Sequence, residues 1–364
     1  MKIQKFQIGL LKSELKVPFQ TSLKSTKYID DVVLILKTNN GLTGFGSAAP
    51  TSQVTGETQG SLVFMIKEII SSLQDQEIVS LKQITQKIQN FCFGNYSAKN
   101  CVEIAIYDLF SQNLKLPLFQ FLGGFKNNIT TSVTISQDKL SKMHLQAKTF
   151  IQNDCTDFKI KMGKNIEDDL KTISEFSKKY KENCKFHIDP NQGWDYSQTK
   201  RFLKFTRENK IEIDVLEQPM SRHNIFDYQR LRKISDTPIL LDESIFHSYD
   251  LMHHIHLKTL DMVNIKLAKC GGISNAQEMI SIAKSAKIPC YLGCMLESHI
   301  AVTAAAHLAC GDGSFIGHDL DPPLLLKKNP VKGGAIFQNN KIVLNEMMSG
   351  LGIQFIENLQ IILE

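Results

Sequence analysis

The sequence predicts an α/β barrel preceded by a smaller α+β unit, and three observations support this prediction. Beyond residue 124, short β-rich runs alternate with helix-like stretches at intervals near 25 residues, which is typical of parallel strands joined by crossover helices. Six or more such units follow one another, which favours closure of the sheet into a barrel. Before residue 124, the order of strand-like and helical segments is different.

Length and composition agree with one barrel plus a modest additional domain. The chain has 364 residues, of which 42% are hydrophobic and 22% charged, as in ordinary globular proteins. The net charge of +5 is spread along the chain instead of forming a block. We therefore expect neither nucleic acid nor a membrane as a partner.

The cysteines and the N-terminus indicate where the protein is found. Eight cysteines are scattered without the dense pattern of a disulfide-stapled secreted domain, so we expect reduced thiols. Cys290 and Cys294 lack a second pair at zinc-ligand spacing. Lysines interrupt the first apolar stretch, and no segment is long enough to span a membrane. These features predict a cytoplasmic protein.

The first unit combines a hairpin with helices. The run VVLILKT at 32–38, followed by the turn-rich NNGLTGFG, predicts a strand, a turn and a second strand. Apolar residues recur at helical spacing over 61–73 and again over 102–114. Gly123 and Gly124 mark the expected end of this unit.

The barrel strands follow in order along the chain. They are expected at 131–135, 157–162, 185–189, 214–219, 238–244, 262–268, 289–296 and 315–320. The segment 333–344 alternates like a hairpin, and we expect it to pack back onto the first unit. The predicted organisation is therefore an α+β unit (1–124), a barrel (125–325) and a returning C-terminal segment (326–364).

Three acids stand at the ends of three successive expected strands: Asp189, Glu217 and Asp242. Their spacing of 28 and then 25 residues is one barrel unit each, so the side chains should meet at one face. Converging carboxylates repel one another unless a cation lies between them, and an all-oxygen ligand set suits Mg²⁺. A single acid after a strand is often only a helix cap, but three in register favour a metal site.

Lysines extend the same register in both directions. Lys159 and Lys161 precede the acids by one unit, and Lys266 follows them by one unit within the apolar run MVNIKLA. Residues two apart on a strand share a face, so both lysines of the pair point into the mouth. We expect repulsion from Mg²⁺ and from neighbouring lysines to lower their pKa and to supply a neutral base.

Several segments carry a resemblance to a known family. KIKMG (159–163), DPNQGW (189–194), LEQP (216–219), DES (242–244) and KLAKCGG (266–272) are similar to the signature of the enolase superfamily, muconate-lactonizing subgroup. GLTGFGSAAP (41–50) and TGET (55–58) resemble that subgroup's capping domain. The resemblance covers nearly the whole chain and implies a modified (β/α)7β TIM-like barrel. It also implies an α+β capping domain formed by the N-terminal region and the C-terminal tail.

The resemblance also implies an isomerase and roles for its residues. Asp189, Glu217 and Asp242 would bind Mg²⁺, and Lys159 would stabilise an enediolate formed from a substrate carboxylate. Lys161 and Lys266 would be the acid and base on opposite sides of the α-carbon. This division agrees with the residues, because an α-proton leaves a carboxylate only where positive charge meets the developing dianion.

Substrate-binding residues narrow the choice within the family. Asp319 and Asp321 resemble the D-x-D with which dipeptide epimerases hold a substrate ammonium, although aspartates before two prolines are also common in turns. Lys24 lies where glutamate-specific members carry an arginine, but a solvated loop lysine is also consistent with the pattern. Thr134 and Cys294 align with pocket-lining positions and could equally pack inside the barrel.

The expected activity is therefore epimerisation of L-Ala-L-Glu-like dipeptides. The alternatives on the same scaffold are an N-acylamino acid racemase, an o-succinylbenzoate synthase or a muconate-type cycloisomerase. The resemblance further implies a homo-oligomer and a role in murein peptide metabolism.

Overall fold

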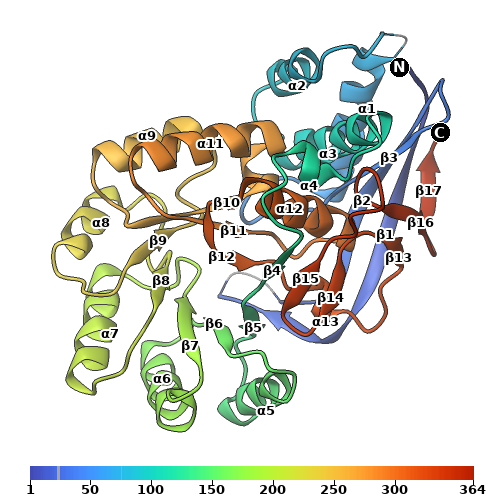
Figure 1. Cartoon of the computed structure of the whole chain (residues 1–364). Coiled ribbons are helices and arrows are strands. Elements are labelled where there is room, and N and C mark those ends of the chain that lie inside the picture. Colours follow the sequence, from blue (N-terminus) through green and yellow to red (C-terminus); the bar gives the residue numbers. More distant parts are fainter. Residues whose placement is uncertain (23–24, 75) are drawn as a thin grey trace.

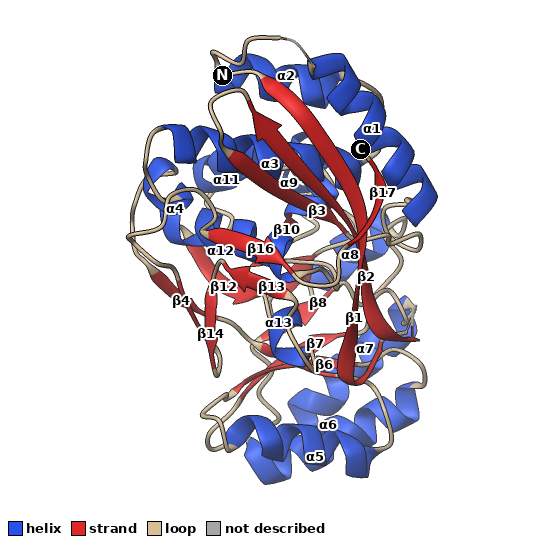
Figure 2. Cartoon of the chain, turned by 90° about the vertical axis from the view of Figure 1, so that its right-hand side faces the viewer, coloured by secondary structure: helices blue, strands red, loops and turns tan. Residues whose placement is uncertain are grey.

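The computed structural model describes residues 1–22, 25–74 and 76–364, and it has a barrel with an α+β cap over one end (Figure 1). The cap sheet has the order β17-β1-β2-β3, and Figure 2 shows these strands side by side with helices behind them. The cap elements are β1 (Ile3–Gln20), β2 (Ser25–Thr38), β3 (Thr43–Ala48), α1 (Gln59–Leu73), α2 (Leu81–Asn90), α3 (Tyr96–Asn113) and α4 (Leu118–Phe121).

Helix α1 of the cap shows why helices form where they do: it has an N-terminal capping box and apolar residues at helical spacing. At the start of α1, the Thr58 side chain accepts a hydrogen bond from the backbone N–H of Ser61, and the Ser61 side chain accepts one from Thr58. Such a capping box stabilises a helix by about 1 kcal/mol. Buried residues recur along one face of α1 at helical spacing, at Leu62, Ile66, Ile69, Ile70 and Leu73. These side chains belong to a hydrophobic cluster that joins α1 to β1, β2 and α3.

The barrel sheet has eight parallel strands in strict chain order, from β5 to β12. Its strands are β5 (Val133–Ile135), β6 (Asp157–Lys161), β7 (Lys185–Asp189), β8 (Val215–Glu217), β9 (Ile239–Leu241), β10 (Met262–Lys266), β11 (Cys290–Gly293) and β12 (Phe315–Asp319). The backbone N–H of Ser132 donates to the carbonyl of His318 at 2.9 Å, which joins the two edges of the sheet. Every strand lies within a range that the sequence predicted.

Seven crossovers connect the strands, which confirms the (β/α)7β order. Their helices are α5 (Leu140–Ile151), α6 (Ile166–Tyr180), α7 (Tyr196–Glu208), α8 (Ile225–Arg232), α9 (Ser248–His256), the pair α10 (Leu267–Cys270) and α11 (Ile273–Ser285), and α12 (His299–Asp312). In α6, acids occupy the first turn and lysines the last, which complements the helix dipole. The short α13 (Pro322–Leu325) follows β12.

Two further small sheets lie beside the barrel. They contain β4 (Asn128–Thr130), β13 (Val331–Gly333), β14 (Ile336–Gln338), β15 (Lys341–Val343) and β16 (Ile353–Ile356). The hairpin expected at 333–344 is present as β14 and β15, but its sheet partner is β4 and not a strand of the cap. The return to the cap is made by β17 (Gln360–Leu363), which pairs antiparallel with β1.

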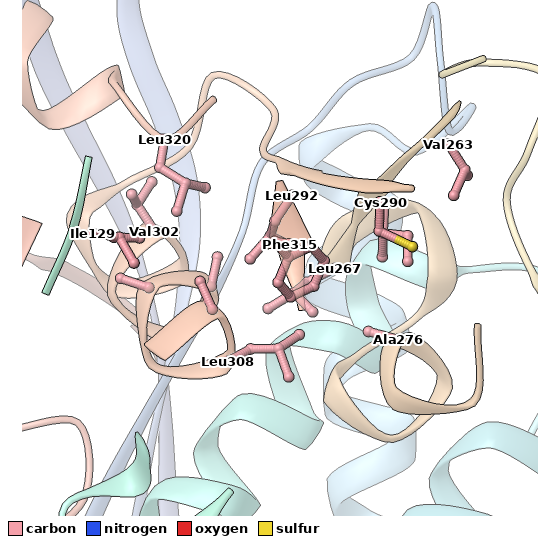
Figure 3. Packing of buried hydrophobic residues seen from close by; sticks show 14 of the residues in the cluster. Ile129, Val263, Leu267, Ala276, Cys290, Leu292, Val302, Leu308, Phe315 and Leu320 are labelled. Atoms are coloured by element: carbon pink, nitrogen blue, oxygen red, sulfur yellow. The ribbon is translucent and has the colours of Figure 1, made fainter. Parts of the chain in front are cut away.

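One large hydrophobic cluster fills the barrel and the space between sheet and helices. Figure 3 shows part of it, where Leu292 and Phe315 pack with Leu267. Several strands, such as DFKIK in β6 and KFHID in β7, alternate apolar and polar residues although they are largely buried, so their polar side chains need partners inside the barrel. Among the described residues, no helix is both long and apolar enough to cross a membrane.

Candidate active site at the mouth of the barrel

The residues singled out by the sequence gather at the carboxyl ends of the barrel strands. Thr134 lies on β5, Lys159 and Lys161 on β6, and Asp189 and Glu217 end β7 and β8. Asp242 directly follows β9, Lys266 ends β10, Cys294 follows β11 and Asp319 ends β12. This is the face on which parallel barrels carry their active sites.

A cavity of about 100 Å³ opens between this face and the cap. The cap contributes Phe19, Thr21, Thr51, Gln53 and Val54, and the barrel contributes Thr134, Lys161, Asn191, Asp242, Glu243, Lys266, Cys294, Met295, Leu296, Asp319, Asp321 and Pro322. The hydroxyl of Ser22 donates to the carbonyl of Asn191 at 2.9 Å, which joins the cap to the rim. The structure therefore brings seven of the predicted residues to one cavity.

Three predicted residues lie directly below this cavity and are fully buried: Lys159, Asp189 and Glu217. The Lys159 ammonium is 2.6 Å from Glu217 Oε2, 2.7 Å from Asp319 Oδ2 and 3.2 Å from Asp189 Oδ2. One ammonium group thus connects carboxylates from three strands. Lys24 lies outside the described residues.

The two other lysines each have their own carboxylate. Lys161 Nζ is 2.6 Å from Asp189 Oδ2, and Lys266 Nζ is 2.6 Å from Asp242 Oδ2. Burial alone would raise the pKa of Asp189, but the ammonium groups of Lys161 and Lys159 outweigh burial and hold that pKa well below its usual range. The pKa of Asp242 is held down in the same way by Lys266 and a further lysine, Lys269.

In this structure the pKa values of two lysines are set by carboxylates. Burial by itself would lower the pKa of Lys159 and Lys266, but the surrounding carboxylates outweigh burial and raise both values above the ordinary lysine value. The prediction considered repulsion between cations, whereas the nearest neighbours of each ammonium are anions. As they stand in this structure, both side chains are held as ammonium ions.

Two residues to which the sequence analysis gave no role hold the carboxylates in place. Lys269, one helical turn after Lys266, is buried with Nζ 2.6 Å from Asp242 Oδ1, and it also donates to the backbone carbonyls of Asp242 and Asn264. Asn264 donates from Nδ2 to Glu217 Oε1 at 2.8 Å. A lysine and an amide inside the apolar segment 262–270 were the available signal, since buried polar groups require partners.

His187 lies two residues before Asp189 on β7, so its side chain points into the same barrel interior. Its Nε2 is 2.6 Å from Glu217 Oε2, and the residue is buried. His187 therefore contacts an expected metal ligand but does not itself line the cavity.

Asp319 and Asp321 both line the cavity but differ in environment. Asp319 is paired with Lys159, which helps to lower its pKa despite burial. Asp321 Oδ2 accepts a 2.7 Å hydrogen bond from the backbone N–H of Thr134. Burial, with the charge of Asp319 added, raises the pKa of Asp321 to about 7. Among the residues that the structure describes, no ammonium group lies within ion-pair distance of Asp321, so a cation from outside would find a buried carboxyl group there.

Cys294 also lines the cavity, and its thiol donates to the carbonyl of Asp319 at 3.3 Å. Burial raises the pKa of this thiol well above its ordinary value. The side chain therefore contacts the site as a neutral thiol and not as a nucleophilic thiolate.

The donor set fits Mg²⁺ in its chemistry. Within 1–22, 25–74 and 76–364, no three acid, histidine or cysteine side chains converge closely enough to form a ready metal centre. Each predicted ligand instead faces a lysine. Even so, Asp189, Glu217 and Asp242 are buried oxygen donors at adjacent strand ends. Next to them, Oε2 of Glu243 and Oδ1 of Asn191 are buried without a hydrogen bond. Hard oxygen donors of this kind suit a hard divalent cation.

Comparison with known proteins agrees with the fold. The family model for the mandelate racemase/muconate lactonizing enzyme N-terminal domain matches residues 7–123, and the enolase C-terminal domain-like model matches residues 142–359. An L-Ala-D/L-Glu epimerase of Clostridium acetobutylicum is 37% identical over 359 residues, which cover 98% of this chain and 100% of that protein.

Two solved structures are similar over nearly their whole length. The substrate-liganded L-Ala-D/L-Glu epimerase of Bacillus subtilis has a TM-score of 0.94 at 31% identity, covering 97% of this chain and 99% of the other. The Enterococcus faecalis dipeptide epimerase with Mg and L-Leu-L-Tyr has a TM-score of 0.93 at 30% identity, covering 98% and 100%. The chain belongs to the mandelate racemase/muconate lactonizing enzyme family of the enolase superfamily.

Proposed function

We propose that the chain is a Mg²⁺-dependent dipeptide epimerase, which moves a proton at the α-carbon of the C-terminal residue. One observation carries this proposal: Lys161 and Lys266 line the same cavity from strands β6 and β10. These strands are four places apart in an eight-stranded ring, so the two amines approach from opposite walls. An epimerase needs this arrangement, because one group must remove the proton and the other must return a proton to the opposite face.

Asp189, Glu217 and Asp242 would hold the metal. When bound, Mg²⁺ would supply positive charge that stabilises developing negative charge on the substrate carboxylate and offsets the negative charge of its ligands. The ammonium of Lys159, already 2.7 Å from Asp319 and 2.6 Å from Glu217, adds a second positive charge at the same end of the cavity. Its role is to stabilise the substrate carboxylate as it gains charge.

Lys161 and Lys266 exchange protons with the α-carbon. In the structure both ammonium groups are held by carboxylates, and a lysine that is to act as base must first lose its proton. Asp242 is the main anion that raises the pKa of Lys266, so neutralising Asp242 would lower that pKa toward the range in which a free amine is available. The other lysine keeps its proton and acts as the acid.

Asp319 and Asp321 favour a dipeptide over an N-acylated amino acid. Two carboxyl groups on the cavity wall complement a free α-ammonium group, whereas an acylated nitrogen leaves them without a charged partner. The names of the similar proteins, L-Ala-D/L-Glu epimerase and dipeptide epimerase, support the same substrate class. An N-acylamino acid racemase, an o-succinylbenzoate synthase or a muconate-type cycloisomerase would not need the pair.

Selectivity for an acidic C-terminal side chain is assigned to Lys24 from the sequence resemblance alone. Phe19 and Thr21, which precede it in the chain, line the cavity. Because lysine provides a point charge and not a bidentate fork, it would recognise a carboxylate with little geometric stringency.

We also infer the domain limits 1–124, 125–325 and 326–364, with the last segment returning to the cap. The pairing of β17 with β1 and the two family matches support them. All eight cysteines are unpaired, which supports a reducing, cytoplasmic location. A murein-derived dipeptide as substrate and a homo-oligomer are expected from the resemblance.

The deciding experiment is incubation of the purified Mg²⁺-loaded protein in D₂O with a dipeptide library that includes L-Ala-L-Glu. Proton NMR measures loss of the α-proton signal of the C-terminal residue and appearance of the second epimer. Parallel samples contain N-acetyl and N-succinyl amino acids. Faster turnover of the acylated compounds than of every free dipeptide would replace the epimerase proposal with the racemase.

A further inference from the structure

Gly293 ends β11 and lies directly beside Lys266 in the parallel register of β10 and β11. Its backbone is in an ordinary strand conformation, since it is not among the glycines with positive φ. Conformational freedom therefore does not explain a glycine here. The other explanation is space, because a glycine lets neighbouring atoms approach where a Cβ would lie.

The three atoms nearest to a Cβ built on Gly293 all belong to side chains. This Cβ would be 2.7 Å from Asn264 Oδ1, 3.0 Å from Asn264 Nδ2 and 3.0 Å from Lys266 Cε. Carbon atoms in contact are normally about 3.5–4.0 Å apart, so both side chains would have to move. Gly46 shows the contrast, because a Cβ there would lie 1.9 Å from the backbone carbonyl oxygen of Cys101. Gly46 is thus needed for packing of the cap, whereas Gly293 makes room for two polar side chains.

Those two side chains have separate tasks in the site. Lys266 places its ammonium 2.6 Å from Asp242 Oδ2 and lines the cavity. Asn264 donates from Nδ2 to Glu217 Oε1 at 2.8 Å and is fully buried. Asn264 has no free space into which it could retreat at no cost, because protein interiors are close-packed. Lys266 could move only into the cavity that it lines, which would change where its ammonium meets a substrate. A methyl group at residue 293 would therefore disturb the approach of one lysine and the hold on one carboxylate, while Lys161 on the opposite wall would be untouched.

We propose that Gly293 is a positioning residue, whose missing side chain reserves the space in which the Lys266 stem and the Asn264 amide are held. This inference rests on the proposed epimerase function. It adds that the two faces of the substrate depend on different parts of the barrel wall. Residue 293 acts on the Lys266 face through sterics, without touching the reacting atoms, and through Asn264 it also supports the hold on Glu217.

The test is Gly293→Ala, with Gly60→Ala as matched control. Gly60 also has no positive φ, and a Cβ there meets nothing within 4 Å. Solvent deuterium exchange is measured separately from each epimer of the dipeptide, and Lys266→Ala identifies which epimer depends on Lys266. For Gly293→Ala we expect exchange from that epimer to fall at least tenfold more than exchange from the other. Gly60→Ala should leave both rates unchanged.

A purely structural role for Gly293 predicts equal losses for both epimers together with a lowered melting temperature, and that result would overturn the proposal. If Gly293→Ala does not fold, the comparison of Asn264→Ala with Asn264→Ala/Gly293→Ala remains. Removing the Asn264 amide makes room for the methyl group. The yield of folded protein, judged by thermal melting, should therefore be at most about twofold lower for the double variant than for Asn264→Ala. If the wild-type protein exchanges the α-proton of no dipeptide, the proposed function is rejected instead. Calorimetry of Mg²⁺ binding to Gly293→Ala would then still test the contact with Asn264.

Discussion

Lys161 and Lys266 approach one cavity from opposite walls of the barrel, and each is paired with a different carboxylate at 2.6 Å. Asp189 holds Lys161 and Asp242 holds Lys266, and both acids also belong to the expected metal site. The charge state of either lysine is therefore tied to what binds the acids. Because each lysine has its own carboxylate and its own wall, a substitution of one lysine should leave the role of the other intact.

Lys161→Ala and Lys266→Ala should each abolish epimerisation, while each variant retains exchange of one epimer only. Removing a general acid or base costs about 10²-fold or more in rate. The measurement is α-deuterium incorporation from each pure epimer in D₂O, followed by NMR. Lys204→Ala is a suitable control, because this lysine lies on exposed α7 with its side chain 71% accessible. An epimerisation rate near wild type in either active-site variant would refute the two-base assignment.

Mg²⁺ removal should stop turnover reversibly, because Asp189, Glu217 and Asp242 would then lack the divalent counter-charge. Binding is also detectable without activity. At a Mg²⁺ concentration a hundred times its Kd, the free energy of unfolding should rise by about 2.7 kcal/mol. Asp189→Asn should remove this gain, whereas Asp236→Asn, whose carboxylate is 86% exposed, should keep it. If exhaustively chelated protein kept its full rate, the three acids would have only a structural role.

The cap is joined to the barrel by a buried carboxylate whose titration can be measured. Glu103 on α3 accepts hydrogen bonds from Ser274 at the start of α11 and from Gln89. Burial raises its pKa to about 7 from an ordinary 4.5. A raised acid pKa means that the folded state binds the proton more tightly than the unfolded state. The contribution of Glu103 to the free energy of unfolding is therefore fully present below pH 4.5 and is lost as the pH rises through about 7.

Glu103→Gln should therefore gain stability relative to wild type as the pH rises from 4.5 to 8, by about 3 kcal/mol in total. Any constant effect of the amide on the Ser274 contacts cancels when the two proteins are compared across pH. Urea unfolding at several pH values gives the difference, and Glu278→Gln on the exposed face of α11 serves as control. A difference that stays flat between these pH values would show that Glu103 is ionised in both states.

Much of the fold was predictable because short β-rich runs recur at one-unit spacing, and some of them end in a polar residue of the site, as β7 does at Asp189 and β10 at Lys266. Residues 185–189 were predicted as a strand and form β7 within the same limits. The length of β1 was not predicted, since lysines interrupt its apolar positions throughout its 18 residues. The prediction that the hairpin at 333–344 packs onto the first unit was also wrong. Alternation indicates a strand but not which distant strand pairs with it.

The site was predictable in position but not in pairing. Strand-end spacing is enough to bring Asp189, Lys161 and Lys266 to one face. It does not tell which anion each ammonium meets, so the raised pKa of Lys159 and Lys266 in this structure was not predicted. The roles of Lys269 and Asn264 depend on side-chain contacts across neighbouring strands, which no local pattern contains.

The substrate class depends on Asp319 and Asp321, and N-acetylation of the dipeptide tests it most directly. Asp321 is buried, accepts a hydrogen bond from Thr134 and lines the cavity, so a substrate ammonium would reach a carboxyl group shielded from water. Charge-assisted hydrogen bonds of this kind are each worth roughly 1.5–3 kcal/mol. N-acetyl-L-Ala-L-Glu should therefore lose at least about tenfold in kcat/KM relative to the free dipeptide.

Asp321→Asn should also lower kcat/KM for the free dipeptide, because the amide keeps an oxygen for the Thr134 N–H but carries no charge. It should affect the acetylated compound much less, because that compound has no ammonium to lose. The two changes are therefore expected to be non-additive, and steady-state kinetics of the four combinations measures the coupling. If the losses simply multiply, the ammonium does not bind at Asp321 and the pair serves only to hold Lys159 and the β5 backbone.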